Sequence, residues 1–354
     1  MRDSILSLAM GFLPGEDVTW LVDENLTADD MSGMQLPADL TTLTNRKDLE
    51  KALNVKKIRV HFSDFNLEEL EPSSRIVYRI SKEKLLAHHC INQSLRNLKP
   101  GGELILLGGK QDGIKSIVKN LDNAYGSKTR IKKHGTSYVA TCVMSDNLYG
   151  QLQGQSDLPG LPDEDYTELR QVSHRGESFY SKPGVFGWNK VDRGSELLVS
   201  MLPEICKYQK QQNDVLDLGC GWGYLMRATA DMPFQRRIAT DNNIAAVRTA
   251  SHNFAQAGMT VECMADDCAS QISGRFDLIL CNPPFHQGFS VSDTMTEKFV
   301  AAAARLCRRD TRVGFVVNQF IPLPKVAEKY FPTCRELLAA DGFKVYLLSP
   351  ASPR

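Results

Sequence analysis

The sequence predicts an α/β fold made of two tandem copies of one domain, each with a central sheet covered by helices on both faces. A chain of 354 residues is long enough for about two domains with separate cores. Apolar strand-like runs alternate with helix-like stretches, which is typical of a parallel sheet wrapped by helices. The order of these elements in the first half returns in the second half. This repetition indicates a duplicated domain.

The first copy consists of apolar runs that predict strands, separated by stretches whose apolar residues have helical spacing. A Pro-Gly-Gly turn at 100–102 leads into one of the later strands. The expected strands cover residues 18–23, 39–44, 57–62, 74–80, 103–107 and 136–143, and the expected helices cover residues 46–53, 85–98 and 114–121.

The second copy has the same succession of elements. Thr44-Asn45-Arg46-Lys47 takes the place of Asp241-Asn242-Asn243-Ile244, and His134-Gly135-Thr136 takes the place of Asp341-Gly342-Phe343. The expected strands cover residues 214–218, 237–241, 260–265, 276–281, 312–317 and 343–348, and the expected helices cover residues 244–257 and 294–306.

A polar stretch rich in Gly, Pro and Asp separates the two copies. Such a composition is typical of a linker. We therefore expect a first domain over residues 1–145, a linker over residues 146–170 and a second domain over residues 171–354. Residues 172–180 are expected to form a hairpin that leads the second domain.

Three alternate glycines follow the first strand of the second copy: Gly219, Gly221 and Gly223, with Asp217 at the end of the strand. Glycine allows a tight turn and a close approach of the backbone to a ligand, and the helix that follows offers unpaired N–H groups. A dinucleotide site expects G-x-G-x-x-G. The G-x-G-x-G spacing instead resembles motif I of S-adenosylmethionine-dependent methyltransferases. A purely structural glycine turn is the alternative.

Two further acids complete the expected cofactor site. Asp241 ends the next strand about 20 residues after the glycines, where a carboxylate accepts the ribose hydroxyls of a nucleoside; a helix N-cap is the alternative role. Asp267 follows the third strand, where this fold places an acceptor for the adenine amine. The first copy has residues 23–26 (Asp-Glu-Asn-Leu) in place of the glycines. We therefore expect it to be catalytically inactive.

The strongest motif is Asn282-Pro283-Pro284-Phe285, directly after the fourth strand of the second copy. The prolines fix the backbone, so that the Asn282 side chain and the Pro283 carbonyl can accept both N–H groups of an exocyclic amine. Phe285 provides a face on which a flipped base stacks. His286 follows, and it is either a substrate-orienting, a catalytic or a structural residue. An incidental proline-stiffened loop is the alternative to the whole motif.

The second copy resembles the bacterial rRNA guanine-N2 methyltransferases in three segments: Asn282-Pro283-Pro284-Phe285-His286-Gln287-Gly288, Pro183-Gly184-Val185-Phe186 and Asp192-x-Gly194-Ser195-x-Leu197-Leu198. The last two favour the small-subunit (16S) branch over the large-subunit branch. The resemblance covers nearly the whole chain and implies two tandem Rossmann-like class I methyltransferase domains with a degenerate N-terminal one. It also implies S-adenosyl-L-methionine as the cofactor, an RNA-binding role for the first domain, and Phe186 and His286 as substrate contacts. Trp222 departs from motif I, where smaller residues are usual.

The net charge is zero, with 42 basic and 42 acidic residues, but its distribution is uneven. Residues 1–74 contain seven Lys/Arg against fourteen Asp/Glu, whereas residues 75–133 contain thirteen against four. Such a basic segment can follow a phosphate backbone, or it can be an ordinary solvated surface. The candidate RNA contacts within it are Lys128, Arg130, Lys132 and Lys133.

The cysteine content and the lack of long apolar runs bear on the cellular compartment and on metal or membrane binding. The nine cysteines form no C-x-x-C pair, which favours reduced thiols in a cytoplasmic protein over disulfides or a zinc site. No apolar run reaches the roughly 18 residues of a membrane span, and the first residues make a poor signal peptide. We therefore expect no metal and no membrane. Nothing in the sequence predicts an oligomeric state.

Together these features predict methylation of the exocyclic N2 amine of a guanine in ribosomal RNA, with small-subunit 16S rRNA or a ribosomal subunit particle as the partner. Three alternatives stay open. One is a large-subunit 23S rRNA guanine-N2 methyltransferase. Another is a DNA-adenine or protein-glutamine methyltransferase, which shares the Asn-Pro-Pro-aromatic motif. The third is a non-catalytic RNA-binding assembly factor with a vestigial cofactor site.

Overall fold

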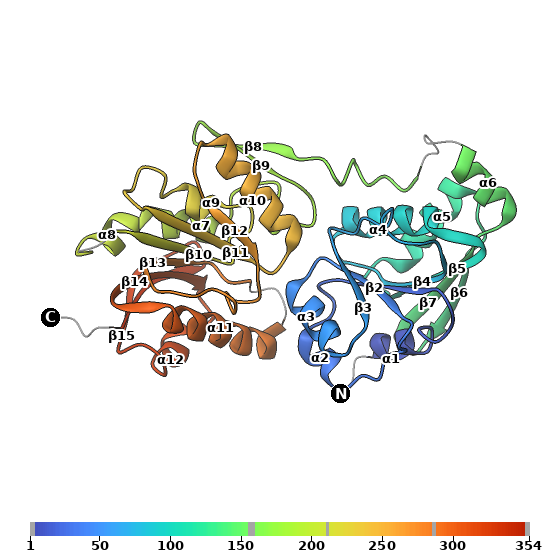
Figure 1. Ribbon diagram of the computed structural model, residues 1–354, viewed down its shortest axis with the longest axis horizontal. Helices are drawn as coiled ribbons and strands as arrows, with labels where there is room; N and C mark the ends of the chain where they lie inside the picture. Colours follow the sequence, from blue (N-terminus) through green and yellow to red (C-terminus); the bar gives the residue numbers. More distant parts are fainter. Residues whose placement is uncertain (1–3, 155–159, 210–211, 285–287, 351–354) are drawn as a thin grey trace. The chain divides into compact units, whose positions relative to one another are not determined.

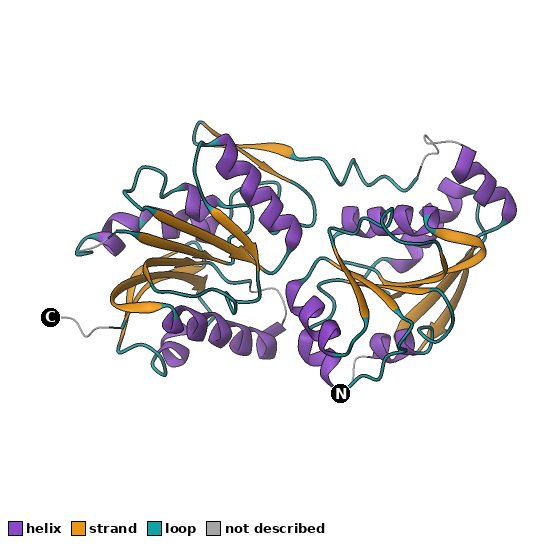
Figure 2. Ribbon diagram, viewed as in Figure 1, coloured by secondary structure: helices purple, strands orange, loops and turns teal. Residues whose placement is uncertain are grey.

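The computed structural model describes residues 4–154, 160–209, 212–284 and 288–350. The chain divides into two compact units, Met1–Glu168 and Leu169–Arg354. Each unit contains one seven-stranded sheet, and the second unit also has a two-stranded one (Figure 1). Helices cover both faces of each large sheet (Figure 2).

The elements of the first unit are mostly those expected from the sequence. Its helices are α1 (Ser4–Met10), α2 (Ala28–Ser32), α3 (Lys47–Val55), α4 (Lys84–Arg96), α5 (Ile114–Tyr125) and α6 (Asp146–Gly154), and its strands are β1 (Val18–Val22), β2 (Thr41–Thr44), β3 (Arg59–Phe62), β4 (Ser73–Arg79), β5 (Leu98–Gly109), β6 (Arg130–His134) and β7 (Ser137–Val143).

The second unit begins with a short hairpin and then follows the same plan. Its helices are α7 (Arg193–Ser200), α8 (Leu202–Cys206), α9 (Tyr224–Arg227), α10 (Ile244–Gln256), α11 (Gly288–Arg305) and α12 (Leu323–Ala327), and its strands are β8 (Arg170–His174), β9 (Glu177–Ser181), β10 (Asp214–Leu218), β11 (Arg236–Asp241), β12 (Glu262–Ala265), β13 (Phe276–Cys281), β14 (Cys307–Asn318), β15 (Thr333–Ala340) and β16 (Phe343–Ser349).

The two large sheets have one topology. Their strand orders are β3-β2-β1-β4-β5-β7-β6 and β12-β11-β10-β13-β14-β16-β15, so every strand has a counterpart. Strands β5 and β14 are both 12 residues long and share one succession of buried and exposed positions. The duplication predicted from the sequence is therefore visible in the fold.

The sheets differ from the parallel sheet expected from the sequence, because their last two strands are antiparallel. β7 pairs with β5 and β6 in this way, and β16 pairs with β14 and β15. The edge strands β6 and β15 were not expected. All five residues of β6 are exposed, so the segment has no alternation of apolar and polar residues that would predict a strand.

Residues 146–154 and 160–168 belong to the first unit, whereas the sequence predicts a linker over 146–170. Helix α6 and the segment after residue 160 pack on this unit through a few widely spaced apolar side chains. Because these apolar residues are few and far apart, the composition of the segment is polar overall and resembles that of a linker. The buried side chains are Leu148, Leu152, Leu161 and Tyr166.

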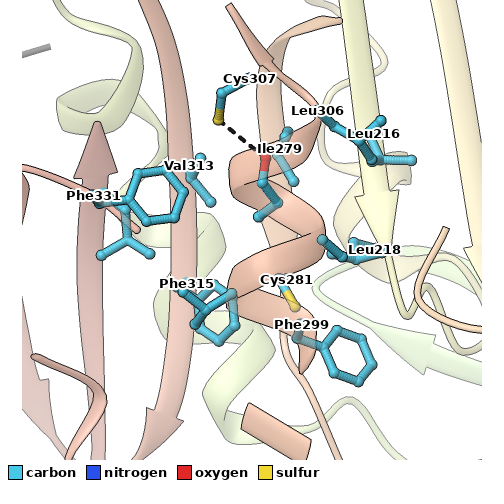
Figure 3. Packing of buried hydrophobic residues seen from close by; sticks show 14 of the residues in the cluster. Leu216, Leu218, Ile279, Cys281, Phe299, Leu306, Cys307, Val313, Phe315 and Phe331 are labelled. Atoms are coloured by element: carbon cyan, nitrogen blue, oxygen red, sulfur yellow. Dashed lines mark hydrogen bonds between the residues drawn. The ribbon is translucent and has the colours of Figure 1, made fainter. Parts of the chain in front are cut away.

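Two apolar layers hold the second sheet. One layer joins the sheet to α11 and α12, and the other joins it to α7, α8, α9 and α10. In Figure 3 the ring of Phe299 on α11 lies beside Leu218 and Cys281, which end the two central strands β10 and β13. Burying one such aromatic side chain contributes about 1.5–3 kcal/mol. The carboxyl ends of these strands are therefore firmly supported.

All nine cysteines are free. Among the described residues, no cluster of three or more His, Cys, Asp or Glu side chains could hold a metal ion. Within the same part of the chain, no helix is both long and apolar enough to cross a membrane.

Candidate active site

The glycine turn after β10 has left-handed backbone at all three glycines, with φ of 81° at Gly219, 54° at Gly221 and 93° at Gly223. A Cβ atom at Gly223 would lie 2.6 Å from the ring of Phe254 on α10. A Cβ atom at Gly221 would meet nothing within 4 Å. Gly223 therefore serves close packing of the helix, whereas Gly221 presents open backbone that a ligand can approach.

Asp241 ties this turn to the neighbouring strand. Its Oδ2 accepts a hydrogen bond from the N–H of Gly221 at 2.9 Å, and its Oδ1 accepts one from Asn243 N–H at 2.9 Å. The N-cap of α10 is Asn243, whose side chain accepts from Ala245 N–H. The capping alternative for Asp241 is thus wrong. The carboxylate is only partly buried, and its oxygens retain capacity to accept ribose hydroxyls.

Asp217, expected as a cofactor contact, lies beneath the turn instead. Its side chain is fully buried, and its Oδ2 accepts a hydrogen bond from Met226 N–H on α9 at 2.9 Å. Burial raises the pKa of Asp217 to about 7. This carboxyl group joins the end of β10 to the helix after the glycines, and its complete burial leaves it no exposed surface for a ligand.

The two acids after β12 have different surroundings. Asp266 is buried and accepts hydrogen bonds from Asp267 N–H, Ser270 Oγ and Gln271 N–H, so it shapes the loop. Asp267 is partly exposed and forms an ion pair with Lys298 on α11, at 2.6 Å. Of the two, only Asp267 has a carboxylate that is not buried, and its role toward the adenine amine stays a prediction.

Asn282 follows β13 and is held by its amide nitrogen. Nδ2 donates hydrogen bonds to Asp192 Oδ2 and to Ser195 Oγ, both at 2.8 Å. Asp192 is also the N-cap of α7 and accepts from Ser195 N–H at 2.9 Å. Pro283, the next residue in the chain, is buried. Phe285 and His286 lie outside the described residues.

Strand pairing brings the two motifs together. Leu218 of β10 pairs with Cys281 of β13 in parallel register, so the next residues, Gly219 and Asn282, leave adjacent strand ends on the same edge of the sheet. In open α/β sheets this edge is the place where ligands bind. The glycine turn, Asp241 and Asn282 therefore lie together at this edge and make up the candidate site.

The β8–β9 hairpin covers the glycine turn. Phe179 and Trp222 pack edge to face with ring centroids 5.2 Å apart, and Trp222 Nε1 donates to Gly187 O. Asn253 on α10 links the hairpin to the glycine turn, because its Nδ2 donates to Tyr180 O in β9 and to Trp222 O in the turn. The unusual tryptophan in motif I is thus the packing partner of this hairpin.

Of the other expected substrate contacts, one lies in the second unit and four lie in the first. Phe186 lies between the hairpin and α7, and half of its side chain is exposed, 50%. The four basic candidates lie in the first unit, three of them on the edge strand β6 and one just before it, and all are exposed. None forms an ion pair with another described residue: Lys128, Arg130, Lys132 and Lys133.

Asp192, Ser195 and Asn253 are site residues whose roles the sequence did not reveal. Asp192 and Ser195 are spaced like a helix cap, and capping alone would explain them. Their second partner, Asn282, is 90 and 87 residues away. Only the fold brings these side chains together.

The first unit lacks the counterparts of these groups. Strand register aligns Leu21 with Leu218, so the segment from Val22 onward replaces the glycine turn. It aligns Thr44 with Asp241 and Arg79 with Asn282. The first unit therefore lacks the open glycine turn that the sequence also showed to be absent, and it has no counterpart of the Asp241 carboxylate or of the Asn282 amide.

Residues 176–347 match the family model described as "Methyltransferase small domain", and residues 25–143 match "Methyltransferase small domain N-terminal". Ribosomal RNA small subunit methyltransferase C of Shewanella loihica is 28% identical over 87% of both chains. The protein of the same name from Pasteurella multocida is 29% identical over 80% of this chain and 82% of its own.

A solved structure shares the whole fold. It is that of the T. thermophilus 16S rRNA N2 G1207 methyltransferase RsmC in complex with AdoMet and guanosine. Its TM-score is 0.79 at 22% identity, over 98% of this chain and 92% of that one. The fold and the site define a methyltransferase with two tandem Rossmann-like domains. The chain belongs to the methyltransferase small domain family, in both its catalytic and its N-terminal part.

Proposed function

We propose that this protein transfers the methyl group of S-adenosylmethionine to the exocyclic N2 amine of a guanine in small-subunit (16S) ribosomal RNA. The observation that carries this proposal is the position of Asn282 beside the glycine turn, with its amide nitrogen already bound to Asp192 and Ser195. Relatives named for small-subunit rRNA methylation support the choice of substrate.

The described residues fit the cofactor. Gly221 offers open backbone, Asp241 offers carboxylate oxygens for the ribose, and Asp267 offers an acceptor for the adenine amine. When bound there, the cofactor supplies an electrophilic methyl group. Gly221 and Asp241 orient the cofactor. Asp217 holds the end of β10 to α9 through its bond to Met226 N–H.

The part of Asn282 is to orient the amine. Its Oδ1 accepts no hydrogen bond from any described residue, so it is available, with the carbonyl of Pro283, for the two N–H groups of the substrate. When Asn282 Oδ1 and the Pro283 carbonyl accept these two N–H groups, the lone pair of the substrate nitrogen points away from them. Catalysis then comes from alignment and from a preorganised polar surrounding, and the proton leaves after the nitrogen has become cationic.

We infer that the first unit binds RNA through its basic edge strand. Lys128, Arg130, Lys132 and Lys133 are exposed and unpaired among described residues, as expected of groups that contact phosphates. We also propose that the partner is rRNA or a ribosomal subunit particle and that the protein acts in the cytoplasm, which the nine free cysteines favour.

The test is to map methylated guanines in rRNA from cells that lack this protein. We expect one N2-methylguanine to disappear from 16S rRNA, and to return with the wild-type gene but not with Asn282→Ala. Loss of a 23S modification would assign the protein to the large subunit. With purified protein and labelled cofactor, transfer only to DNA or to a protein would overturn the proposal. So would the absence of any transfer together with the absence of cofactor binding.

A further inference from the structure

The amide of Asn282 can face its substrate in two ways. The oxygen and the nitrogen of a side-chain amide have nearly the same size, and a rotation of 180° exchanges an acceptor for two donors. Only the oxygen can bind the N–H groups of an amine. A site that relies on this asparagine therefore needs something that fixes the amide.

The structure shows what fixes it. Both N–H groups of Nδ2 have an acceptor at 2.8 Å, Asp192 Oδ2 and Ser195 Oγ. Asp192 carries a charge that strengthens its bond and polarises the amide toward a more negative Oδ1. The start of α7 is packed tightly here, since a Cβ atom at Gly194 would lie 2.9 Å from the ring of Phe343.

We propose that Asp192 and Ser195 are positioning residues that set the orientation of the Asn282 amide. The inference rests on the proposed function of Asn282. A helix cap alone does not explain the arrangement, because capping uses the Ser195 N–H and would need neither the Ser195 hydroxyl nor Asn282.

The test separates capping from positioning. Asp192→Ser keeps a good N-cap but is too short to reach Asn282, whereas Asp192→Asn keeps an acceptor oxygen. We expect Asp192→Ser and Ser195→Ala to lower kcat by about tenfold to hundredfold, the loss typical of one hydrogen bond to a charged or preorganised partner. Asp192→Asn should recover most of the activity. The affinities for cofactor and RNA should not change.

A double-mutant comparison shows whether the loss of kcat in Asp192→Ser arises through the Asn282 amide. If Asp192 acts through the amide, Asp192→Ser should cost nothing further in a protein that already contains Asn282→Ala. Thr27→Ala, which removes the N-cap of α2 in the first unit, controls for the loss of a cap. Normal kcat in folded Asp192→Ser and Ser195→Ala, or a full additional loss in the double variant, would overturn this proposal. Inactive wild-type protein would instead count against the proposed function.

A second, independent observation concerns the first unit. Strand register aligns Phe62 with Ala265, because they pair with Thr44 and Asp241. The next N–H groups also match, with Ser63 donating to Thr44 O and Asp266 to Asp241 O. Asp64 is therefore the counterpart of Asp267.

The helices give a second match. α4 ends at Arg96 and α11 at Arg305, each followed after one residue by the strand that begins at Leu98 or Cys307. Counted from these ends, His89 is the counterpart of Lys298. The pair Asp267–Lys298, at the proposed adenine position, thus corresponds to Asp64 and His89.

Between these two counterparts lies Tyr166. Its hydroxyl donates to Asp64 Oδ1 at 2.9 Å, and its ring stacks on His89 with centroids 4.5 Å apart and an angle of 25°. The side chain is 1% exposed. Neighbouring backbone is anchored as well, because Asn92 Nδ2 donates to Leu161 O and His88 Nδ1 lies 2.7 Å from Pro162 O.

We infer that Tyr166 fills the first unit's counterpart of the adenine pocket. A planar ring with one hydrogen-bond donor, supplied by the chain itself, takes the place of a planar base with an amine. The first unit would then exclude a cofactor even if its glycines were restored. The same contacts anchor the chain three residues before the second unit begins at Leu169.

The test uses the full chain with S-adenosylhomocysteine present to fill the second unit's site. Tyr166→Ala should open a pocket, and adenine should then raise its melting temperature by several degrees while leaving the wild type unchanged. Tyr125→Ala, which removes another buried tyrosine of this unit, should not respond to adenine. Asp64→Ala added to Tyr166→Ala should abolish the effect. Stabilisation of both tyrosine variants by p-cresol but of neither by adenine would reject the inference.

Discussion

The N–H of Gly221 donates a hydrogen bond to Oδ2 of Asp241 at 2.9 Å, and this bond joins the glycine turn after β10 to the end of β11. The same carboxylate also holds Asn243 N–H. One side chain therefore fixes the open part of the turn and the start of α10 together. Two of the proposed cofactor contacts, Gly221 and Asp241, are thus joined to each other by a hydrogen bond.

Gly221→Val should abolish cofactor binding while the second unit stays folded. The space beside Gly221 is open, but φ is 54° there, and a β-branched side chain is strained in that region and would stand where the ligand approaches. Calorimetric titration with S-adenosylmethionine measures the effect. A second mole of cofactor bound per wild-type chain would contradict the assignment of one site.

Gly223→Ala is compared with Gly221→Ala, which also has left-handed backbone but no neighbour within 4 Å. The Cβ atom of Gly223→Ala would lie 2.6 Å from Phe254, so we expect a loss of stability of about 1–3 kcal/mol from overpacking together with weaker binding. Thermal unfolding separates the two glycines. If Gly221→Ala destabilises the protein as much as Gly223→Ala does, the packing role assigned to Gly223 is wrong.

Asn282→Ala should lower turnover by a few orders of magnitude, comparable to the loss of a preorganised polar group at about 3–4 kcal/mol. Cofactor affinity should stay close to that of the wild type, because Gly221 and Asp241 are untouched. Single-turnover methyl transfer to rRNA is the measurement. Near-normal turnover in the folded variant would move the search for the catalytic residue to His286.

Lys132→Glu with Lys133→Glu on β6 should weaken rRNA binding and reduce its dependence on salt, by about 0.7–0.9 in the log–log slope per lost phosphate contact. Cofactor affinity should not change. Lys57→Glu with Arg59→Glu, at the opposite edge of the same sheet, is the control. Equal effects of both pairs across a salt series would show a general charge effect rather than a contact surface.

Asp217→Asn should remove a pH dependence of stability. Burial raises the pKa of Asp217 to about 7, whereas an unfolded aspartate titrates near about 3.9. The folded state thus holds a proton that the unfolded state loses, so this contribution is full below pH ~4 and is lost as pH rises to about 7. The contribution of Asp217 to the free energy of unfolding therefore falls by roughly 4 kcal/mol as the pH rises.

This pH dependence is measured by denaturant unfolding of the wild type and of Asp217→Asn between pH 4 and 8. We expect the variant to gain relative to wild type as the pH rises. The exposed Asp231→Asn provides the same chemical change without burial. A constant difference between Asp217→Asn and wild type over this range would contradict the raised pKa.

Much of the fold could be predicted from local patterns. The strands β1, β10 and β13 are short apolar runs with clear boundaries, and the glycine spacing at 219–223 and Asn282-Pro283 mark the turns after two of them. Duplication was visible because the order of elements repeats. The edge strands β6 and β15 escaped prediction, since an edge strand buries little and needs no alternating pattern.

Residue type and local spacing are enough to identify the candidate residues for the chemistry, namely the glycines, Asp241 and Asn282. How these residues act depends on contacts that form only in the folded protein. The tertiary structure turned Asp217 inward, held the Asn282 amide with Asp192 and Ser195, and placed Tyr166 between Asp64 and His89. The physical reason is that hydrogen bonds and ring stacking depend on distances of about 3–5 Å, and residues 77–102 positions apart along the chain reach such distances only after the strands have set their register.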